Sequence, residues 1–170
     1  DSPAGYWRLD DTDTTVRDSS GHGAEAVIEG SYSQGVTGAT ADGNAATRFT
    51  GGLMSLPVDR FLASNFSIEA WILSDGGGGT VARNSQWLFT VGNRVSFHAN
   101  QSETVLVDLQ SEPIPQDGAW HHVVVTFDSD HQVVQIFVDG ALNASAASNG
   151  GIIAAANEFP TVGYLNAALD

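Results

Sequence analysis

The stretch from residue 119 to residue 145 alternates apolar and polar side chains in the manner of adjacent β-strands. Val123 and Val125 share one parity, and successive side chains of a strand point to opposite faces. The same alternation resumes after a short polar turn and is followed by Asp139 and Gly140, a residue pair that favours a tight hairpin. The pattern predicts three consecutive antiparallel strands that bury one face.

Similar short alternating runs recur along the rest of the chain, separated by most of its 19 glycines. No window holds apolar residues at helical spacing for three turns, so we expect helix only as single turns, for instance at residues 59–63. Strands are predicted at residues 5–9, 25–29, 46–49, 53–56, 66–73, 86–91, 94–99, 105–109, 120–127, 133–138 and 141–145. Many short strands with glycine-rich turns are typical of a β-sandwich.

Five segments resemble laminin G-like (LamG) domains of bacterial type, in the concanavalin A-like lectin/glucanase jelly-roll superfamily. They are AGYWRLD at residues 4–10, DSSGHG at 18–23, FSIEAWI at 66–72, WHHV at 120–123 and IFVDG at 136–140. Because they follow the family's order over nearly the whole chain, the resemblance implies an all-β antiparallel β-sandwich with residues 1–170 as a single domain. Residues 166–170 resemble only the start of the family's last strand, so the domain is expected either to lack that strand or to be interrupted there.

The charge balance bears on the class of partner. Twenty acidic residues oppose six basic ones, all arginine, which gives a formal net charge of −14. Six scattered arginines cannot form the basic patch that phosphate backbones require, so no nucleic acid partner is expected. The apolar runs are shorter than the ~18 residues that cross a bilayer, so no membrane insertion is expected either. The absence of cysteine excludes disulfides and favours a bacterial or archaeal source.

Fourteen of the acidic residues are aspartate, a hard oxygen ligand that suits Ca²⁺. The LamG resemblance implies a structural calcium ion between the loop at residues 18–23 and the final strand. By position it nominates Asp18 and Asp170 as side-chain ligands and Gly21 and Gly23 as carbonyl donors. The alternative interpretations are that Asp-Ser-Ser-Gly is simply a favourable turn and that acidity only keeps the surface soluble.

The sequence offers little for catalysis. Glycoside hydrolysis requires two carboxylates roughly 5–9.5 Å apart, and Glu69 has no acidic neighbour two residues away on its strand. Without cysteine or a Gly-x-Ser-x-Gly turn, nucleophilic hydrolysis is disfavoured as well. His121 and His122 are adjacent and point to opposite faces of a regular strand, so they cannot chelate one ion together.

A sugar-binding surface would need an exposed aromatic ring among polar groups. Trp7, Trp71 and Trp120 match family core positions, so we expect them to be buried. Trp87 follows a polar loop and is a candidate platform, with core packing as the alternative. The predicted ligand-binding residues are Arg83, Asn84, Trp87, His98, Asn100, Tyr164 and Asn166.

Together these observations predict a non-catalytic carbohydrate-binding or adhesion module of a larger bacterial protein, secreted or displayed on the cell surface. Its expected partners are a glycan or another cell-surface ligand and the neighbouring domains of its own polypeptide. The alternative is a protein-binding or structural spacer module of a calcium-stiffened adhesin. A glycoside hydrolase is the third class, because the fold alone does not separate these functions.

Overall fold

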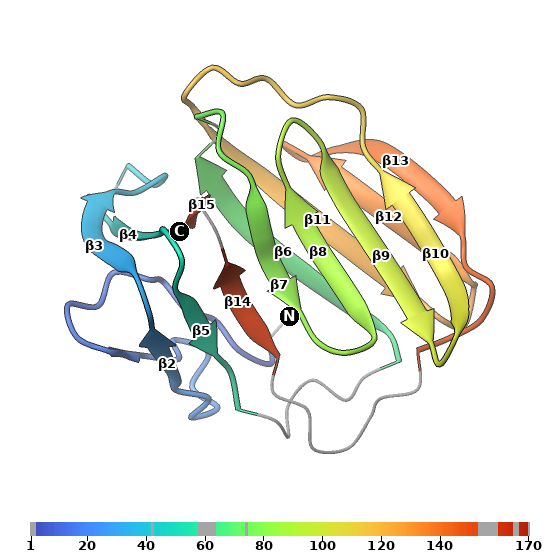
Figure 1. The fold of residues 1–170 in the computed structure, drawn as a ribbon, viewed down its shortest axis with the longest axis horizontal. Helices are drawn as coiled ribbons and strands as arrows, with labels where there is room; N and C mark the ends of the chain where they lie inside the picture. Colours follow the sequence, from blue (N-terminus) through green and yellow to red (C-terminus); the bar gives the residue numbers. More distant parts are fainter. Residues whose placement is uncertain are drawn as a thin grey trace.

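The computed structural model describes residues 3–41, 43–57, 64–73, 75–152, 160–164 and 167–169. Within these ranges every strand pairing is antiparallel, and the strands form two layers (Figure 1). No helix in the described part of the chain is both long and apolar enough to cross a membrane.

The front layer in Figure 1 is, over the described residues, an eight-stranded sheet. Its strands in spatial order are β1 (Thr15–Val16), β2 (Ala26–Glu29), β5 (Leu53–Ser55), β14 (Thr161–Tyr164), β7 (Gly79–Arg83), β8 (Trp87–Val91), β9 (Val95–Gln101) and β10 (Thr104–Gln110). The ladder is locally irregular in β7 and in β10.

The second layer is a seven-stranded sheet, again counted over the described residues. Its strands in spatial order are β13 (Ala141–Ala147), β12 (Val133–Val138), β11 (Trp120–Asp128), β6 (Phe66–Leu73), β15 (Ala167–Leu169), β4 (Ala45–Phe49) and β3 (Tyr32–Thr37). In each sheet the last described strand along the chain lies between two strands from earlier in the sequence. β14 lies between β5 and β7, and β15 lies between β6 and β4.

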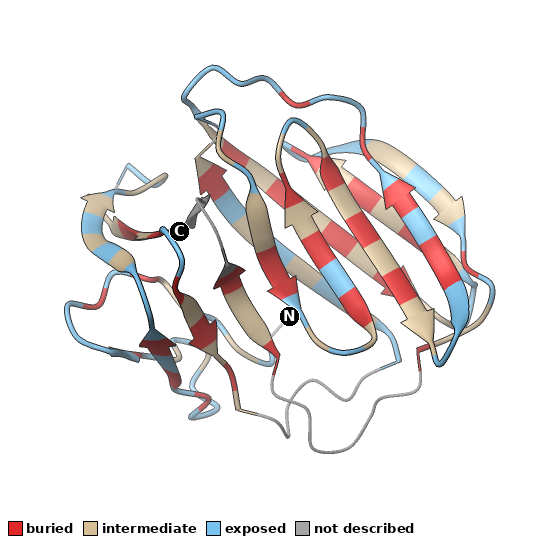
Figure 2. Ribbon diagram, in the orientation of Figure 1, coloured by how far each residue is buried: buried red, intermediate tan, exposed pale blue. Residues whose placement is uncertain are grey.

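The core lies between the layers, where alternate residues of the long strands β8, β9, β11 and β12 are buried (Figure 2). Its aromatic centre joins both sheets: the Phe66 ring stacks on Phe127 at a centroid distance of 5.6 Å, and Phe97 lies 6.2 Å from Phe127. Burying large aromatic and branched side chains supplies the main driving force for this packing. The prediction of an antiparallel β-sandwich is confirmed.

Several predicted elements are confirmed and one is wrong. The strands β6 and β12 have the predicted bounds, and Asp139 and Gly140 form the β12–β13 turn with φ values of 50° and 78°. The predicted strand at residues 5–9 is reduced to a single bridge between Trp7 and Asp18. Strands β1, β3, β7 and β14 were not predicted, and the expected helical turn at residues 59–63 lies outside the described residues.

Candidate functional site

A small hollow of about 100 Å³ opens where the β7–β8 turn meets the end of β9. The β7–β8 turn and the end of β9, which bound the hollow, lie at the lower rim of the eight-stranded sheet in Figure 1. The residues that line it are Asn84, Ser85, Gln86, Trp87, Leu88, His98 and Asn100. Four of these, Asn84, Trp87, His98 and Asn100, belong to the predicted ligand-binding set.

Asn84 shapes the turn that forms one wall of the hollow. Its side-chain Oδ1 accepts hydrogen bonds from the backbone N–H groups of Gln86 and Trp87, each at 2.9 Å. The Asn100 N–H donates to the Gln86 carbonyl at 2.8 Å and ties the turn to β9. Such local side-chain bonds stabilise a tight turn. Asn84 therefore has a structural role in the hollow, whatever else it contacts.

The outer face of the sheet carries a row of chemically different side chains beside the hollow. The cross-strand register aligns Arg83 of β7 with Leu88 of β8, Leu88 with His98 of β9, and His98 with Asp108 of β10. Leu88 and Asp108 are exposed and His98 is half-buried. Cation, apolar surface, imidazole and carboxylate thus stand side by side, and sheet neighbours of this kind are about 5 Å apart.

The side chains of His98 and Asn100 form no hydrogen bond with the described residues. An imidazole and a carboxamide can each donate and accept hydrogen bonds. Both groups lie on the solvent side of β9, where the burial pattern alternates with the buried Phe97 and Ala99. They are the groups in the hollow best placed to bind hydroxyls.

Trp87 belongs to the core. Trp87 is only 7% exposed, and its ring packs against Phe66 and Phe97 at centroid distances of 5.7 Å and 6.3 Å. It shares parity with the buried Phe89 and Val91, which fixes it on the inner face. The alternative reading of Trp87, core packing, is therefore the one the structure shows. Tyr164 ends β14, and Asn166 lies outside the described residues.

The loop at residues 18–23 is organised around the Asp18 carboxylate. One of its oxygens accepts hydrogen bonds from the N–H groups of Tyr6 and Ser20, and the other accepts them from the Ser20 hydroxyl and the Ala24 N–H. Desolvation opposes ionisation, but these four bonds prevail and hold the pKa of Asp18 far below its usual range. The carboxylate thus closes the loop on its own backbone.

This geometry bears on the predicted calcium ion. Each Asp18 oxygen already accepts two hydrogen bonds. In this position the carboxylate therefore has no oxygen free to coordinate a cation. Gly21 and Gly23 adopt φ values of 84° and 70°, and Asp170 lies outside the described residues. The described residues contain no group of three or more His, Asp or Glu side chains able to hold a metal. Calcium binding stays a prediction.

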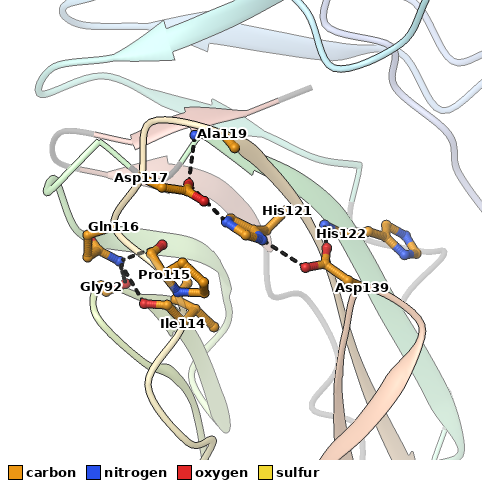
Figure 3. A network of polar contacts seen from close by, with 9 residues as sticks. All are labelled: Gly92, Ile114, Pro115, Gln116, Asp117, Ala119, His121, His122 and Asp139. Carbon is orange, nitrogen blue, oxygen red and sulfur yellow. Dashed lines mark hydrogen bonds and ion pairs between the residues drawn. The ribbon is translucent and has the colours of Figure 1, made fainter.

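His121 and His122 point to opposite faces of β11, as predicted (Figure 3). The buried His121 Nδ1 lies 2.8 Å from the Asp139 carboxylate and its Nε2 lies 3.4 Å from Asp117. Asp139 also accepts the His122 N–H at 2.9 Å, while Asp117 accepts the Ala119 N–H. This network fixes the start of β11 to the β12–β13 turn and to the preceding loop. The imidazole stands between the two carboxylates.

Comparison with known proteins decides the family. A laminin G profile, described as the concanavalin A-like lectin/glucanases superfamily, matches residues 48–169. The chain belongs to the concanavalin A-like lectin/glucanases superfamily. No curated protein matches the sequence.

Solved structures resemble this concanavalin A-like domain at low sequence identity. The binding domain of Paraclostridial Mosquitocidal Protein 1 has a TM-score of 0.72 at 13% identity, over 95% of this chain and 45% of that one. The binding domain of Botulinum Neurotoxin DC in complex with SialylT has a TM-score of 0.62 at 18% identity, over 91% and 43%. The chain therefore spans less than half of these toxin domains.

A third structure is closer in size. Domain 4 of AbnA, a GH43 extracellular arabinanase from Geobacillus stearothermophilus, in complex with arabinotriose, has a TM-score of 0.64 at 15% identity. The match covers 90% of this chain and 82% of that domain. At such identities the likeness establishes the fold alone.

One prediction for this concanavalin A-like domain is wrong. Trp71 was expected in the core, but it lies on the outer face of β6 and is 37% exposed. The charged Glu69 two residues earlier shares its parity, so both side chains face solvent while Ile72 is buried. The position of Glu69 was the signal in the sequence that identifies the outer face. Trp7 and Trp120 are half-buried.

Proposed function

We propose that this chain is a non-catalytic carbohydrate-binding module of a larger extracellular protein. The observation that carries the proposal is the hollow on the eight-stranded sheet, where His98 and Asn100 offer hydrogen-bonding groups next to the exposed Leu88. Sugar recognition needs this combination, because a sugar presents hydroxyls around its rim and C–H groups on its faces.

The comparisons support the same function by analogy. Domain 4 of AbnA is described in complex with arabinotriose, and the neurotoxin binding domain is described in complex with SialylT. Both are named as parts of larger proteins, one of them extracellular. Glu69 and Asp108 are acids on the outer faces of the sandwich, but they lie on different sheets and so do not form the carboxylate pair of a glycoside hydrolase. This arrangement supports a module that holds a glycan for a partner domain. The proposed location is the exterior of the cell.

The test is glycan binding by the intact chain and by a His98→Ala/Asn100→Ala double variant. Losing two hydrogen-bonding side chains should weaken binding about 10- to 100-fold, at roughly 1 kcal/mol for each bond. Thr90→Ala is the matched control, since Thr90 lies on the same strand face two residues beyond Leu88. A glycan array identifies the ligand and calorimetry measures the affinity. Full affinity in the double variant, or no bound glycan at all, contradicts the proposal.

A second candidate function is protein binding, as in a spacer module of an adhesin. It is favoured by Val105 and Leu142, two apolar residues about half exposed on the edge strands β10 and β13. These edges of the two sheets contact each other along one side of the sandwich.

Release of reducing ends from a bound polysaccharide would instead assign the chain to the glycoside hydrolases.

A further inference from the structure

Trp71 is the most exposed tryptophan among the described residues. It lies in the middle of the seven-stranded sheet, on β6 between β11 and β15, and it faces away from the core. A large aromatic ring on the solvent side of a central strand contributes little to core packing. An exposed indole offers a flat apolar face and a polar N–H group to a molecule that binds there.

Two polar side chains flank the indole. The cross-strand register sets His122 of β11 directly opposite Trp71, and the two rings lie 5.1 Å apart between centroids at an interplanar angle of 38°. The His122 Nε2 lies 3.5 Å from the Glu69 carboxylate. The Glu69 side chain is 70% exposed, and the His122 side chain is 28% exposed. The three residues therefore form one open surface, here called the Trp71 platform.

The Trp71 platform has the parts that a neutral sugar ring requires. The indole face can pack against the C–H groups of one face of a pyranose. Glu69 can accept hydrogen bonds from hydroxyls at the rim of the ring, and bonds to a carboxylate are stronger than neutral ones. His122 adds a second polar contact on the neighbouring strand. Because both strands are central in their sheet, these groups are held in a fixed arrangement.

The charge of the molecule narrows the ligand class. Glu69 lies directly on the platform, and the chain carries a formal net charge of −14. A sialylated or uronic-acid ligand would be repelled at this place. A neutral hexose or pentose pyranose avoids that repulsion and still satisfies the carboxylate with its hydroxyls.

We infer that Trp71, Glu69 and His122 form a second carbohydrate-binding site, which takes a neutral pyranose residue of a glycan. The hollow of the proposed function lies on the outer face of the eight-stranded sheet, and the platform lies on the outer face of the seven-stranded sheet. The inference extends the proposed function but rests on different residues. It makes the domain bivalent, with one sugar site on each side of the sandwich.

The experiment is a glycan array of neutral and sialylated glycans, probed with the intact chain, Trp71→Ala, Glu69→Gln and the His98→Ala/Asn100→Ala variant, here called the hollow variant. Ser67→Ala is the matched control, because Ser67 is exposed on the same face of β6, two residues before Glu69. Trp71→Phe keeps a smaller ring and should retain part of the binding. Thermal unfolding checks that each variant is folded.

We expect a group of neutral glycans whose binding falls at least tenfold in Trp71→Ala and severalfold in Glu69→Gln, with no change in Ser67→Ala or in the hollow variant. Binding of the same glycan should quench or shift tryptophan fluorescence in the intact chain and not in Trp71→Ala. If the hollow variant loses the binding of every glycan and Trp71→Ala loses none, the second site is refuted while the proposed function survives. The exposed indole could instead bind a quaternary ammonium ion through a cation–π contact. Quenching of the Trp71 fluorescence by choline chloride, with no glycan whose binding depends on Trp71, would also refute the second site. An array without any bound glycan would refute both proposals.

Discussion

His121 shows how single residues fix the loops of this sandwich. Its side chain is 8% exposed, and each ring nitrogen faces a carboxylate, Asp139 on one side and Asp117 on the other. Burial opposes protonation of the ring, but the hydrogen bonds and charges of the two carboxylates outweigh it and raise the pKa of His121 above its usual value of 6.5. The folded state therefore favours the protonated form of His121 more than the unfolded state does.

The raised pKa predicts a pH-dependent contribution to stability. A group whose folded-state pKa is raised stabilises the fold fully below its unfolded pKa, and that stabilisation is lost as the pH rises through the folded pKa. Asp139→Asn keeps an oxygen for the His122 N–H but removes the charge. We expect it to lower the free energy of unfolding by about 1 kcal/mol near pH 5.5, a value reduced because Asp139 is half exposed, and by less near pH 9.

Urea unfolding of both proteins at the two pH values measures this difference. The control is His131→Gln, because His131 also pairs with an aspartate, Asp128, but in an exposed turn. Screening by water should leave that variant close to the intact chain. A cost of Asp139→Asn that stays constant or grows as the pH rises would contradict the assignment of charge to His121.

Trp71 and Trp87 show what could be predicted about the candidate sites. Both lie in apolar runs, and the side of the sheet follows from parity once one neighbour is decisive. Glu69 is decisive for Trp71, and Phe89 is consistent with the buried position of Trp87. The residues near position 84 and residues 98 and 100 line one hollow, because β8 and β9 form a hairpin that brings the β7–β8 turn to the end of β9. The capping role of Asn84 depends on backbone geometry that composition does not reveal.

At the scale of the element, β14 shows how closely the layers approach. Gly163 has a φ of 75° within this strand, and a Cβ built on it would lie 2.7 Å from the Phe49 ring. Phe49 is fully buried, so its ring cannot move aside without disturbing the core. Only glycine satisfies both the backbone conformation and the contact.

We expect Gly163→Ala to lower the free energy of unfolding by about 3 kcal/mol, the sum of overpacking and an unfavourable φ. The matched control is Gly76→Ala, since Gly76 has a φ of 85° but nothing within 4 Å of the added Cβ. That change should cost about 1 kcal/mol, from the backbone alone. Denaturant unfolding measures both. Equal costs for the two substitutions would show that the Phe49 contact is relaxed without strain.

Three of the four strands that were not predicted, β1, β7 and β14, share a physical cause. The strand β1 has two residues and β14 has four, including Gly163, while β7 begins at the end of a run of four glycines. Such segments carry too few alternating side chains to stand out, and they form strands because neighbouring strands offer backbone partners. The long strands β6, β11 and β12 could be predicted because eight, nine and six residues alternate without interruption.

At the scale of the whole molecule, the charge of −14 over 170 residues implies self-repulsion in the folded state. Salt screens such repulsion within roughly 10 Å at ~0.1 M. We therefore expect the thermal midpoint to rise by a few degrees between low salt and about 0.5 M NaCl, and equally in KCl. A midpoint that is flat or falls with salt would mean that the charges are already balanced locally.

The same assay tests the calcium prediction. CaCl₂ at the ionic strength of the NaCl reference should raise the midpoint further, and EDTA should reverse the rise, if a specific site exists. Asp18→Ala separates the two roles of that carboxylate: it should destabilise the loop in either salt, and it should abolish any extra effect of Ca²⁺. An equal midpoint in the two salts would leave Asp18 with its hydrogen-bonding role alone.

The order of the strands has a further consequence, for synthesis. β14 joins β5 to β7, and β15 joins β6 to β4, so neither sheet is continuous until these last strands arrive. A chain synthesised only as far as β13 has each sheet split into two parts, with bare inner edges at β5 and β7 in one sheet and at β6 and β4 in the other. Such edges can pair with the strands of other chains. The nascent chain must keep those edges apart from its neighbours until translation has passed residue 169.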